Sequence, residues 1–283
     1  MPTLTPTPAL DALLDLALSE DIGCGDVTTE AVIPPNVVGG AMLIARERLV
    51  LCGAPAVERL LWRYGPVAPA ITWQVAEGSL VEPDTVVAVL DGRLRDLLVV
   101  ERTVLNLLQR MSGVATLTRR YVDAIAETKA RVVDTRKTIP GHRVLDKYAT
   151  RVGGAANHRH GLDGGLLIKD NHLVAAGGVR EAVRLARERA PHALRVEVEV
   201  ETPNELDEAL AAKADVVLID NFSPVEARAA VRQVAGRAIV EASGGITLDT
   251  IRAFADAGVD LISVGALTHS AVAVDLSMDI RAT

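Results

Sequence analysis

The sequence has 283 residues, of which 49% are hydrophobic and 24% charged, a composition typical of a soluble globular protein with one large or two modest domains. The net charge of −7 argues against nucleic acid or an anionic membrane surface as the main partner. Only 2% of the residues are aromatic, so we expect a core packed with Leu, Val, Ile and Ala.

The chain carries no pattern of secretion or membrane insertion. Its two cysteines, Cys24 and Cys52, have neither the spacing of a disulfide framework nor that of a metal site. No basic segment followed by an apolar run opens the sequence, and no stretch of about 20 apolar residues occurs. We therefore expect a cytoplasmic protein.

The N-terminal part favours a small α+β domain with an antiparallel sheet. The predicted elements are a helix over 9–18, a turn-rich stretch over 19–26, strands over 40–45, 71–75 and 86–90, and a helix over 55–64. A long helix is predicted over 95–126, with a break near Gly113. We place the domain boundary at this break, which gives domains 1–112 and 113–268.

From residue 131 onward, short apolar runs alternate with helical segments. Strands are predicted over 132–134, 166–169, 196–200, 216–220, 238–242 and 261–264, and helices over 179–189, 203–212, 224–234 and 248–257. Strand–helix–strand units at this spacing indicate a parallel sheet. A TIM-like α/β barrel, complete or incomplete, is the first interpretation, and a doubly wound open sheet is the alternative.

Polar residues follow each of the six predicted strands. They are Asp134–Lys137, Lys169–His172, Glu199 with Glu201, Asp220–Asn221, Ser243–Gly245 and Gly265. In a barrel these positions converge on the face that carries active sites. Any one of them could belong to an ordinary polar loop, but six in succession favour a functional site.

Basic residues are concentrated in the middle of this acidic chain. Eight Lys or Arg fall between Arg131 and Lys169, and the candidate site group is Arg136, Lys137, His158, Arg159 and Lys169, with Arg102 upstream. They stand among Gly, Asn and His rather than at amphipathic spacing, which favours a polyanionic ligand over a solvated charged face. Two alternatives stay open, namely that Lys169 is a Schiff-base lysine as in barrel aldolases and that His158 is a structural hydrogen-bond partner.

The acids and glycines at the strand ends predict a metal and a phosphate site. Glu199 and Asp220 could hold Mg²⁺ directly or through water, or could form salt bridges with the basic group. Glu197, Glu199 and Glu201 alternate, so they share one strand face and need cationic partners if that face points inward. Glycines in the Ser243–Gly245 and Gly265 loops allow backbone N–H groups to approach a phosphate, although glycines also serve plain tight turns.

Taken in order, these motifs resemble the quinolinate phosphoribosyltransferases over almost the whole chain. The matching segments are Glu20–Thr29, Glu101–Asn106, Asp134–Thr138, Asn157–Arg159, Ile168–His172, Glu241–Gly245 and Ser263–Ser270. The resemblance implies transfer of phosphoribosyl from phosphoribosyl pyrophosphate to quinolinate with decarboxylation, giving nicotinate mononucleotide for NAD biosynthesis.

The resemblance also implies an N-terminal α/β sandwich domain, with the tail 269–283 packed on it, and an incomplete barrel. It implies a homodimer, or a higher oligomer, in which Arg102 comes from the partner chain, and it implies Mg²⁺ at Glu199 and Asp220. Lys169, Glu199 and Asp220 are the implied catalytic residues. The implied substrate-binding residues are Arg102, Thr135, Arg136, Lys137, His158, Arg159 and Lys169, and the 5′-phosphate is expected at Ser243, Gly244, Gly245 and Gly265.

Two positions depart from the family pattern. Ala155 replaces the third glycine before the Asn-His-Arg segment, and Gly164 stands where an acid is common. A sister group found in molybdate operons tends to lose the acid at the position of Asp134 and the Lys169–His172 segment, both of which are present here. A non-catalytic anion-binding protein is the remaining alternative.

Overall fold

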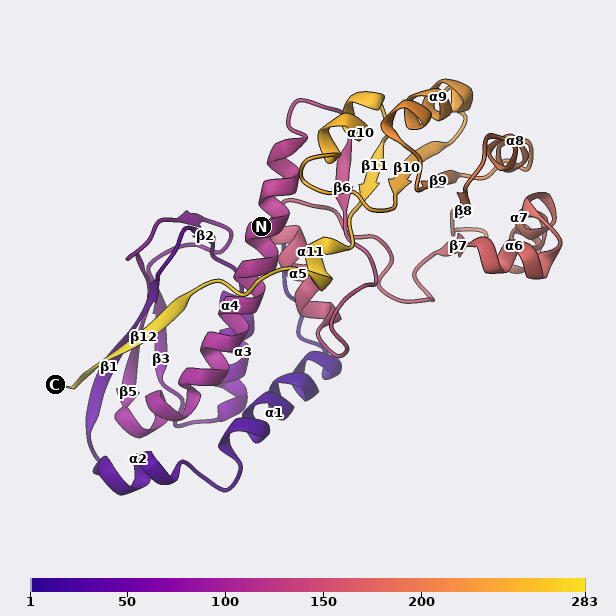
Figure 1. Cartoon of the computed structure of the whole chain (residues 1–283). Helices are drawn as coiled ribbons and strands as arrows, with labels where there is room; N and C mark the ends of the chain where they lie inside the picture. The colour runs from indigo at the N-terminus through magenta and orange to yellow at the C-terminus, as the bar shows by residue number, and fades with distance from the viewer. Residues whose placement is uncertain (1, 283) are drawn as a thin grey trace. The chain divides into compact units, whose positions relative to one another are not determined.

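The structure is a computed structural model that describes residues 2–282. It divides into two compact units, each with its own sheet (Figure 1). The first unit comprises the chain up to Arg119, residues 138–154 and the chain from Ser270 onward, and the second comprises residues 120–137 and 155–269. Residues 138–154 therefore belong with the N-terminal part, although strands of the second unit flank them in sequence.

The first unit contains a four-stranded antiparallel sheet in the order β12-β1-β5-β3. The C-terminal strand β12 pairs with β1 from Gly39↔Ala282 to Ala45↔Leu276. The elements of this unit are α1 (Pro8–Ile22), α2 (Val27–Val32), β1 (Val38–Ala45), β2 (Leu49–Val50), α3 (Ala54–Tyr64), β3 (Ala70–Trp73), β4 (Leu80–Val81), β5 (Val86–Arg93), most of α4 (Leu94–Ala124), α5 (Arg143–Val152) and β12 (Leu276–Ala282).

The core of the first unit is almost entirely aliphatic, as the composition predicted. Buried Leu and Val side chains from the sheet, α1, α3 and α4 form one cluster, and Tyr148 is the one buried aromatic residue among the described members of this cluster. No helix within residues 2–282 combines the length and the apolar character needed to cross a membrane.

The predicted helix break near Gly113 is wrong, because α4 continues through it for 31 residues. A Cβ atom at Gly113 would stand 2.1 Å from the backbone oxygen of Val272, so this glycine allows the C-terminal segment to cross the helix in close contact. Glycine in a helix therefore marks a packing requirement here rather than an end.

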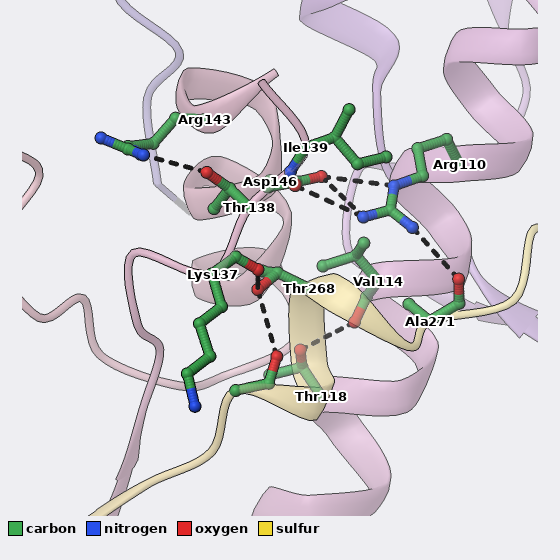
Figure 2. Close-up of polar contacts among 11 residues, drawn as sticks. Arg110, Val114, Thr118, Lys137, Thr138, Ile139, Arg143, Asp146, Thr268 and Ala271 are labelled. Carbon is green, nitrogen blue, oxygen red and sulfur yellow. Dashed lines mark hydrogen bonds and ion pairs between the residues drawn. The ribbon is translucent and has the colours of Figure 1, made fainter. Parts of the chain in front are cut away.

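One arginine joins three segments of the first unit (Figure 2). Arg110 on α4 donates to the carboxylate of Asp146 on α5, at 3.2 Å from Nη2, and to the carbonyl of Ala271, at 3.1 Å. Asp146 is almost fully buried, and burial raises the pKa of its carboxyl while Arg110 opposes that effect. This network attaches the C-terminal segment and α5 to the long helix.

The second unit is an incomplete α/β barrel, as predicted. All five strand pairings are parallel, in the order β6-β11-β10-β9-β8-β7. Strands β7 to β11 lie side by side in sequence order, and the first strand, β6, pairs with the last, β11, as in a barrel. A doubly wound sheet instead grows outward in both directions from an inner strand, so the alternative interpretation is wrong. The elements are β6 (Arg131–Val133), β7 (Leu166–Ile168), α6 (Asp170–Ala176), α7 (Val179–Arg189), β8 (Val196–Val200), α8 (Pro203–Ala211), β9 (Val216–Asp220), α9 (Pro224–Val234), β10 (Ile239–Ser243), α10 (Ile251–Ala257), β11 (Leu261–Ser263) and α11 (Ala266–His269).

Helix caps fix where the strand-end loops stop. Thr202 and Ser223 each accept a hydrogen bond from the backbone N–H three residues later, and the glutamate side chain at that position accepts one from the backbone N–H of the cap residue. Proline follows each cap at the first helical position. The chain therefore turns into α8 after a loop of two residues and into α9 after a loop of three, so both helices begin close to the ends of β8 and β9 (Figure 1).

Candidate functional site

The predicted barrel residues gather at the carboxyl ends of the parallel strands. Arg136 and Lys137 follow β6, Lys169 follows β7, Glu199 and Asp220 lie at the ends of β8 and β9, Ser243 ends β10, and Gly265 follows β11. The register aligns these ends, with Glu199 opposite Leu218 and Asp220 opposite Ser243. In a parallel barrel this edge is the usual position of an active site.

Asp134 holds the loop that carries His158 and Arg159. Its fully buried carboxylate accepts hydrogen bonds from Nδ2 of Asn157, at 2.6 Å, and from the backbone N–H of His158, at 2.8 Å. A parallel bridge between Val133 and Ala156 continues the sheet onto this loop. The loop is thereby fixed beside β6, although the sequence offered no strand signal for it.

Two arginines come close together on this side of the site. Burial lowers the pKa of the Arg159 guanidinium, and the nearby positive charge of Arg136 lowers it further. Arg159 donates from Nη1 to the carbonyl of Gly165, at 3.1 Å, which fixes its direction. Like charges held in proximity favour the binding of an anion, because an anion relieves their repulsion.

Lys169 and Glu199 form an ion pair between β7 and β8. Glu199 is largely buried, whereas the Lys169 side chain is partly exposed. Two acids on the expected inward face of β8 thus have partners: Glu199 pairs with Lys169, and Glu197 contacts His158. Glu201 lies beyond the end of the strand and is exposed, so it does not share this environment.

His158 contacts two buried acids. Its Nε2 lies 3.1 Å from Oε2 of Glu197 and 3.8 Å from Oε1 of Glu241. Its Nδ1 accepts the backbone N–H of Arg159 at 2.8 Å, so the hydrogen of the neutral ring is on Nε2. These contacts fit the alternative that His158 is a structural hydrogen-bond partner, and they fit the prediction that it binds a ligand equally well. Sequence reasoning treated Glu241 only as part of a motif and missed this contact.

The glycine loops lie close to other functional segments. Gly244 has φ +98°, and a Cβ there would stand 2.3 Å from Oδ1 of Asn221. At Gly265 a Cβ would stand 2.9 Å from Cδ of Lys137, so the glycine leaves room for the lysine side chain. Thr268 Oγ1 donates to the backbone carbonyl of Lys137 at 2.7 Å, and this bond secures the Lys137 backbone beside α11 (Figure 2). The backbone N–H of Lys137 is held by Thr135 Oγ1 at 3.1 Å.

The ends of β8 and β9 offer oxygen donors suited to a hard cation. Asp220 is partly exposed and accepts from Nδ2 of Asn221 at 2.7 Å. It lines a cavity of about 350 Å³ together with Glu201 and Asn221. Glu199 does not line this cavity but lies on the adjacent strand β8. Carboxylates at neighbouring strand ends are the kind of oxygen donor that suits Mg²⁺, which takes a few carboxylates and keeps its own water.

Arg102 lies apart from this group in the chain. It is an exposed residue on α4, in the first unit, whereas the other candidate residues belong to the second.

Ala155, one of the two departures from the family pattern, is buried, and its position accommodates the methyl group. A Cβ at Gly164 would stand 3.3 Å from Cβ of Arg159, so glycine there allows the chain to pass close to that arginine.

Comparison with known proteins gives matches over nearly the whole chain. Two family models match, the quinolinate phosphoribosyl transferase N-terminal domain over residues 26–112 and the C-terminal domain over residues 114–279. The chain is 41% identical to the probable carboxylating nicotinate-nucleotide pyrophosphorylase of Bacillus subtilis, covering 96% of this chain and 93% of that protein. It is 40% identical to the carboxylating enzyme of that name from Homo sapiens, covering 99% and 94%. The structure of the nicotinate-nucleotide pyrophosphorylase from Francisella tularensis has a TM-score of 0.92 at 38% identity, covering 99% of this chain and 100% of that one.

Proposed function

The chain belongs to the quinolinate phosphoribosyl transferase family, and from this membership we propose how the residues of its barrel perform the reaction. The protein is a pentosyltransferase of NAD biosynthesis. It transfers phosphoribosyl from phosphoribosyl pyrophosphate to quinolinate and forms nicotinate mononucleotide, pyrophosphate and CO₂. The observation that carries the assignment of this chemistry to the barrel is the set of cationic residues at its strand ends.

The two carboxylates of quinolinate bind the arginines of the site. The positive charge of Arg136 lowers the pKa of the Arg159 guanidinium, so the two residues are close enough to offer both guanidinium groups to one small dianion. His158 and Lys169 lie on the same edge, on the loop beside β6 and after β7. Arg102 of the partner subunit completes the carboxylate contacts in a homodimer, and its exposure on α4 makes it available for that role.

The phosphoribosyl group lies against the glycine loops. Ser243, Gly244, Gly245 and Gly265 present backbone N–H groups to the 5′-phosphate, and Lys137 passes over Gly265 to add a positive charge. Thr135 shapes this segment by holding the N–H of Lys137. With the 5′-phosphate bound there, we expect the ribose to lie near the acids that end β8 and β9.

Glu199 and Asp220 would hold Mg²⁺, directly or through water. When bound, the ion supplies positive charge to the pyrophosphate leaving group. The ion pair with Lys169 keeps the Glu199 carboxylate at the edge of the site in the absence of substrate. That pairing also opposes the aldolase alternative, because a Schiff-base lysine must react as the neutral amine.

The chain's own residues then order the bond changes. Glu199 and Asp220 stabilise positive charge at the anomeric carbon as its bond to pyrophosphate breaks. The arginines orient quinolinate so that the ring nitrogen forms the new bond to that carbon. The ring nitrogen becomes cationic. As the adjacent carboxylate leaves as CO₂, the electron pair of the broken C–C bond stays on the ring carbon, where the neighbouring positive nitrogen stabilises it, and that carbon then takes up a proton from solvent.

Product analysis tests this function. The purified protein is incubated with quinolinate, phosphoribosyl pyrophosphate and Mg²⁺, and a parallel sample receives nicotinate in place of quinolinate. We expect nicotinate mononucleotide only from quinolinate, because binding requires both carboxylates. Ligand binding without product from a folded sample would instead support the non-catalytic alternative.

A further inference from the structure

The barrel encloses an acidic cluster that the proposed reaction does not use. Glu197 on β8, Glu241 on β10 and His158 place their polar atoms within 4.8 Å of one another. They line a cavity of about 310 Å³ together with Arg159, Arg195 and apolar strand residues. Glu241 is 1% exposed, and Oε1 of Glu241 and Oε1 of Glu197 lack a hydrogen-bond partner within the described part of the chain.

The ring of His158 cannot donate a hydrogen bond to both Glu197 and Glu241. Nδ1 of His158 accepts from Arg159, so the ring carries one hydrogen, on Nε2, and that hydrogen points to Glu197 at 3.1 Å. Two buried ionised carboxylates beside a neutral ring would repel each other and lose their hydration. In this assignment Nε2 carries the hydrogen and the lone pair of Nδ1 accepts from Arg159, so neither ring nitrogen is available to a metal ion. This argues against a metal at these three residues.

We propose that Glu241 is a positioning residue that stays a neutral carboxylic acid and donates its hydrogen to Glu197. Glu197 then accepts two hydrogens, one from Glu241 and the Nε2 hydrogen of His158. The ring is held in a single tautomer, its Nδ1 holds the Arg159 N–H, and the Arg159 guanidinium is aimed at the substrate. The inference rests on the proposed function, in which Arg159 binds a quinolinate carboxylate.

The charges around Glu241 agree with this assignment. Burial and, to a smaller extent, the negative charge of Glu197 raise its pKa, His158 and the Ser263 hydroxyl oppose them, and the net pKa is about 7. The charged and titratable groups that face the cluster are Glu197 from β8, His158 and Arg159 from the loop beside β6, and Arg195 from the cavity wall. Above neutral pH, ionisation of Glu241 would place a second negative charge beside Glu197.

The first test compares pH profiles of kcat/KM for quinolinate in the wild-type protein and Glu241→Gln. Glutamine keeps the shape and the hydrogen-bond donor of the acid but cannot ionise. We expect E241Q to stay within about threefold of wild type near pH 6.5 and to lose the decline that wild type shows above pH 7. Glu208→Gln, on the exposed face of α8, removes the same charge away from the site and should keep the wild-type profile. Identical profiles for wild type and E241Q would overturn the proposal.

The second test needs no turnover and separates this inference from the proposed function. ¹⁵N NMR of the ligand-free wild-type protein, with His158 assigned from a His158→Gln sample, reads the protonation of both ring nitrogens. We expect a neutral ring with hydrogen on Nε2 at pH 6.5. An imidazolium, or a ring with hydrogen on Nδ1, would contradict the proposed arrangement of hydrogens even if the protein makes product. The expected tautomer in a protein that makes no product would contradict the proposed function alone.

Discussion

At the scale of single residues, Arg136 is the most direct test of the proposed substrate site. It follows β6 and lies close enough to Arg159 for its positive charge to lower the pKa of that guanidinium. We expect Arg136→Ala to lower kcat/KM for quinolinate by about a thousandfold, or about 4 kcal/mol, because a bidentate partner of a carboxylate is lost. Arg131→Ala, an exposed residue at the opposite end of the same strand, is the matched control. Steady-state kinetics of both variants decide the point, and near-normal turnover of Arg136→Ala would remove Arg136 from the site.

Glu241 also gives a prediction for stability. Its pKa rises from an ordinary value of 4.5 to about 7 in the folded protein, so between these pH values the folded state keeps a proton that the unfolded state releases. The wild-type free energy of unfolding therefore falls with rising pH in this window, relative to Glu241→Gln. The difference should grow by on the order of 3 kcal/mol from pH 4.5 to 7 and then level off. Urea denaturation at several pH values measures it, and a difference that does not change with pH would show that folding does not raise the pKa of Glu241.

The residues of the site were largely predictable, but their partners were not. Arg136, Lys169, Glu199 and Asp220 follow apolar strand runs, and that pattern alone places them at the barrel edge. The pairing of Lys169 with Glu199 and the hydrogen bonds of Asp134 depend on loop paths that no periodicity encodes. Glu241 was inconspicuous because one acid within an apolar strand resembles an ordinary strand end.

At the scale of secondary structure, the strongly periodic elements were predicted closely. The helices 179–189 and 224–234 and the strands 196–200 and 216–220 have the predicted bounds. Helices α2, α5 and α6 were missed, and they are short segments of 6, 10 and 7 residues. Their polar and glycine-flanked sequences resemble loops, and tertiary contacts such as that between Arg110 and Asp146 stabilise α5 instead.

Gly113 provides a test at this scale. Alanine normally stabilises a helix relative to glycine by about 1 kcal/mol. Here the added Cβ would press on the backbone oxygen of Val272, so we expect Gly113→Ala to destabilise the protein by on the order of 2 kcal/mol. Asn106→Ala, on the exposed face of the same helix, should be neutral or slightly stabilising. Chemical denaturation compares the two, and a stabilised Gly113→Ala would contradict the close crossing of the C-terminal segment.

At the scale of the whole molecule, the sequence order does not match the order in space. The first unit takes residues from the beginning, the middle and the end of the chain, and strand β12 pairs with β1. A division of the sequence into consecutive segments cannot describe this, because pairing between distant strands depends on topology rather than on local pattern. The parallel direction of the barrel strands, in contrast, follows from the repeated strand–helix units in the sequence.

The proposed homodimer predicts complementation between two inactive variants. Arg102→Ala retains the barrel residues, and Arg136→Ala retains Arg102. If each site takes Arg102 from the partner subunit, mixed dimers contain one intact site, and random reassortment should restore about a quarter of wild-type activity. Unfolding and refolding the variants together, with each refolded alone as a control, measures this. No recovery from a dimeric mixture would indicate that each chain supplies its own Arg102.

The carboxylating transfer at the barrel edge is tested most directly with quinolinate labelled with ¹³C in the carboxylate next to the ring nitrogen. The labelled substrate is mixed with phosphoribosyl pyrophosphate, Mg²⁺ and the wild-type protein, and nicotinate mononucleotide and ¹³CO₂ are counted together. We expect one ¹³CO₂ for each nicotinate mononucleotide, and a loss of both in parallel in Arg136→Ala. Nucleotide that keeps the label, or ¹³CO₂ released without phosphoribosyl pyrophosphate, would contradict the proposed order of bond formation and decarboxylation.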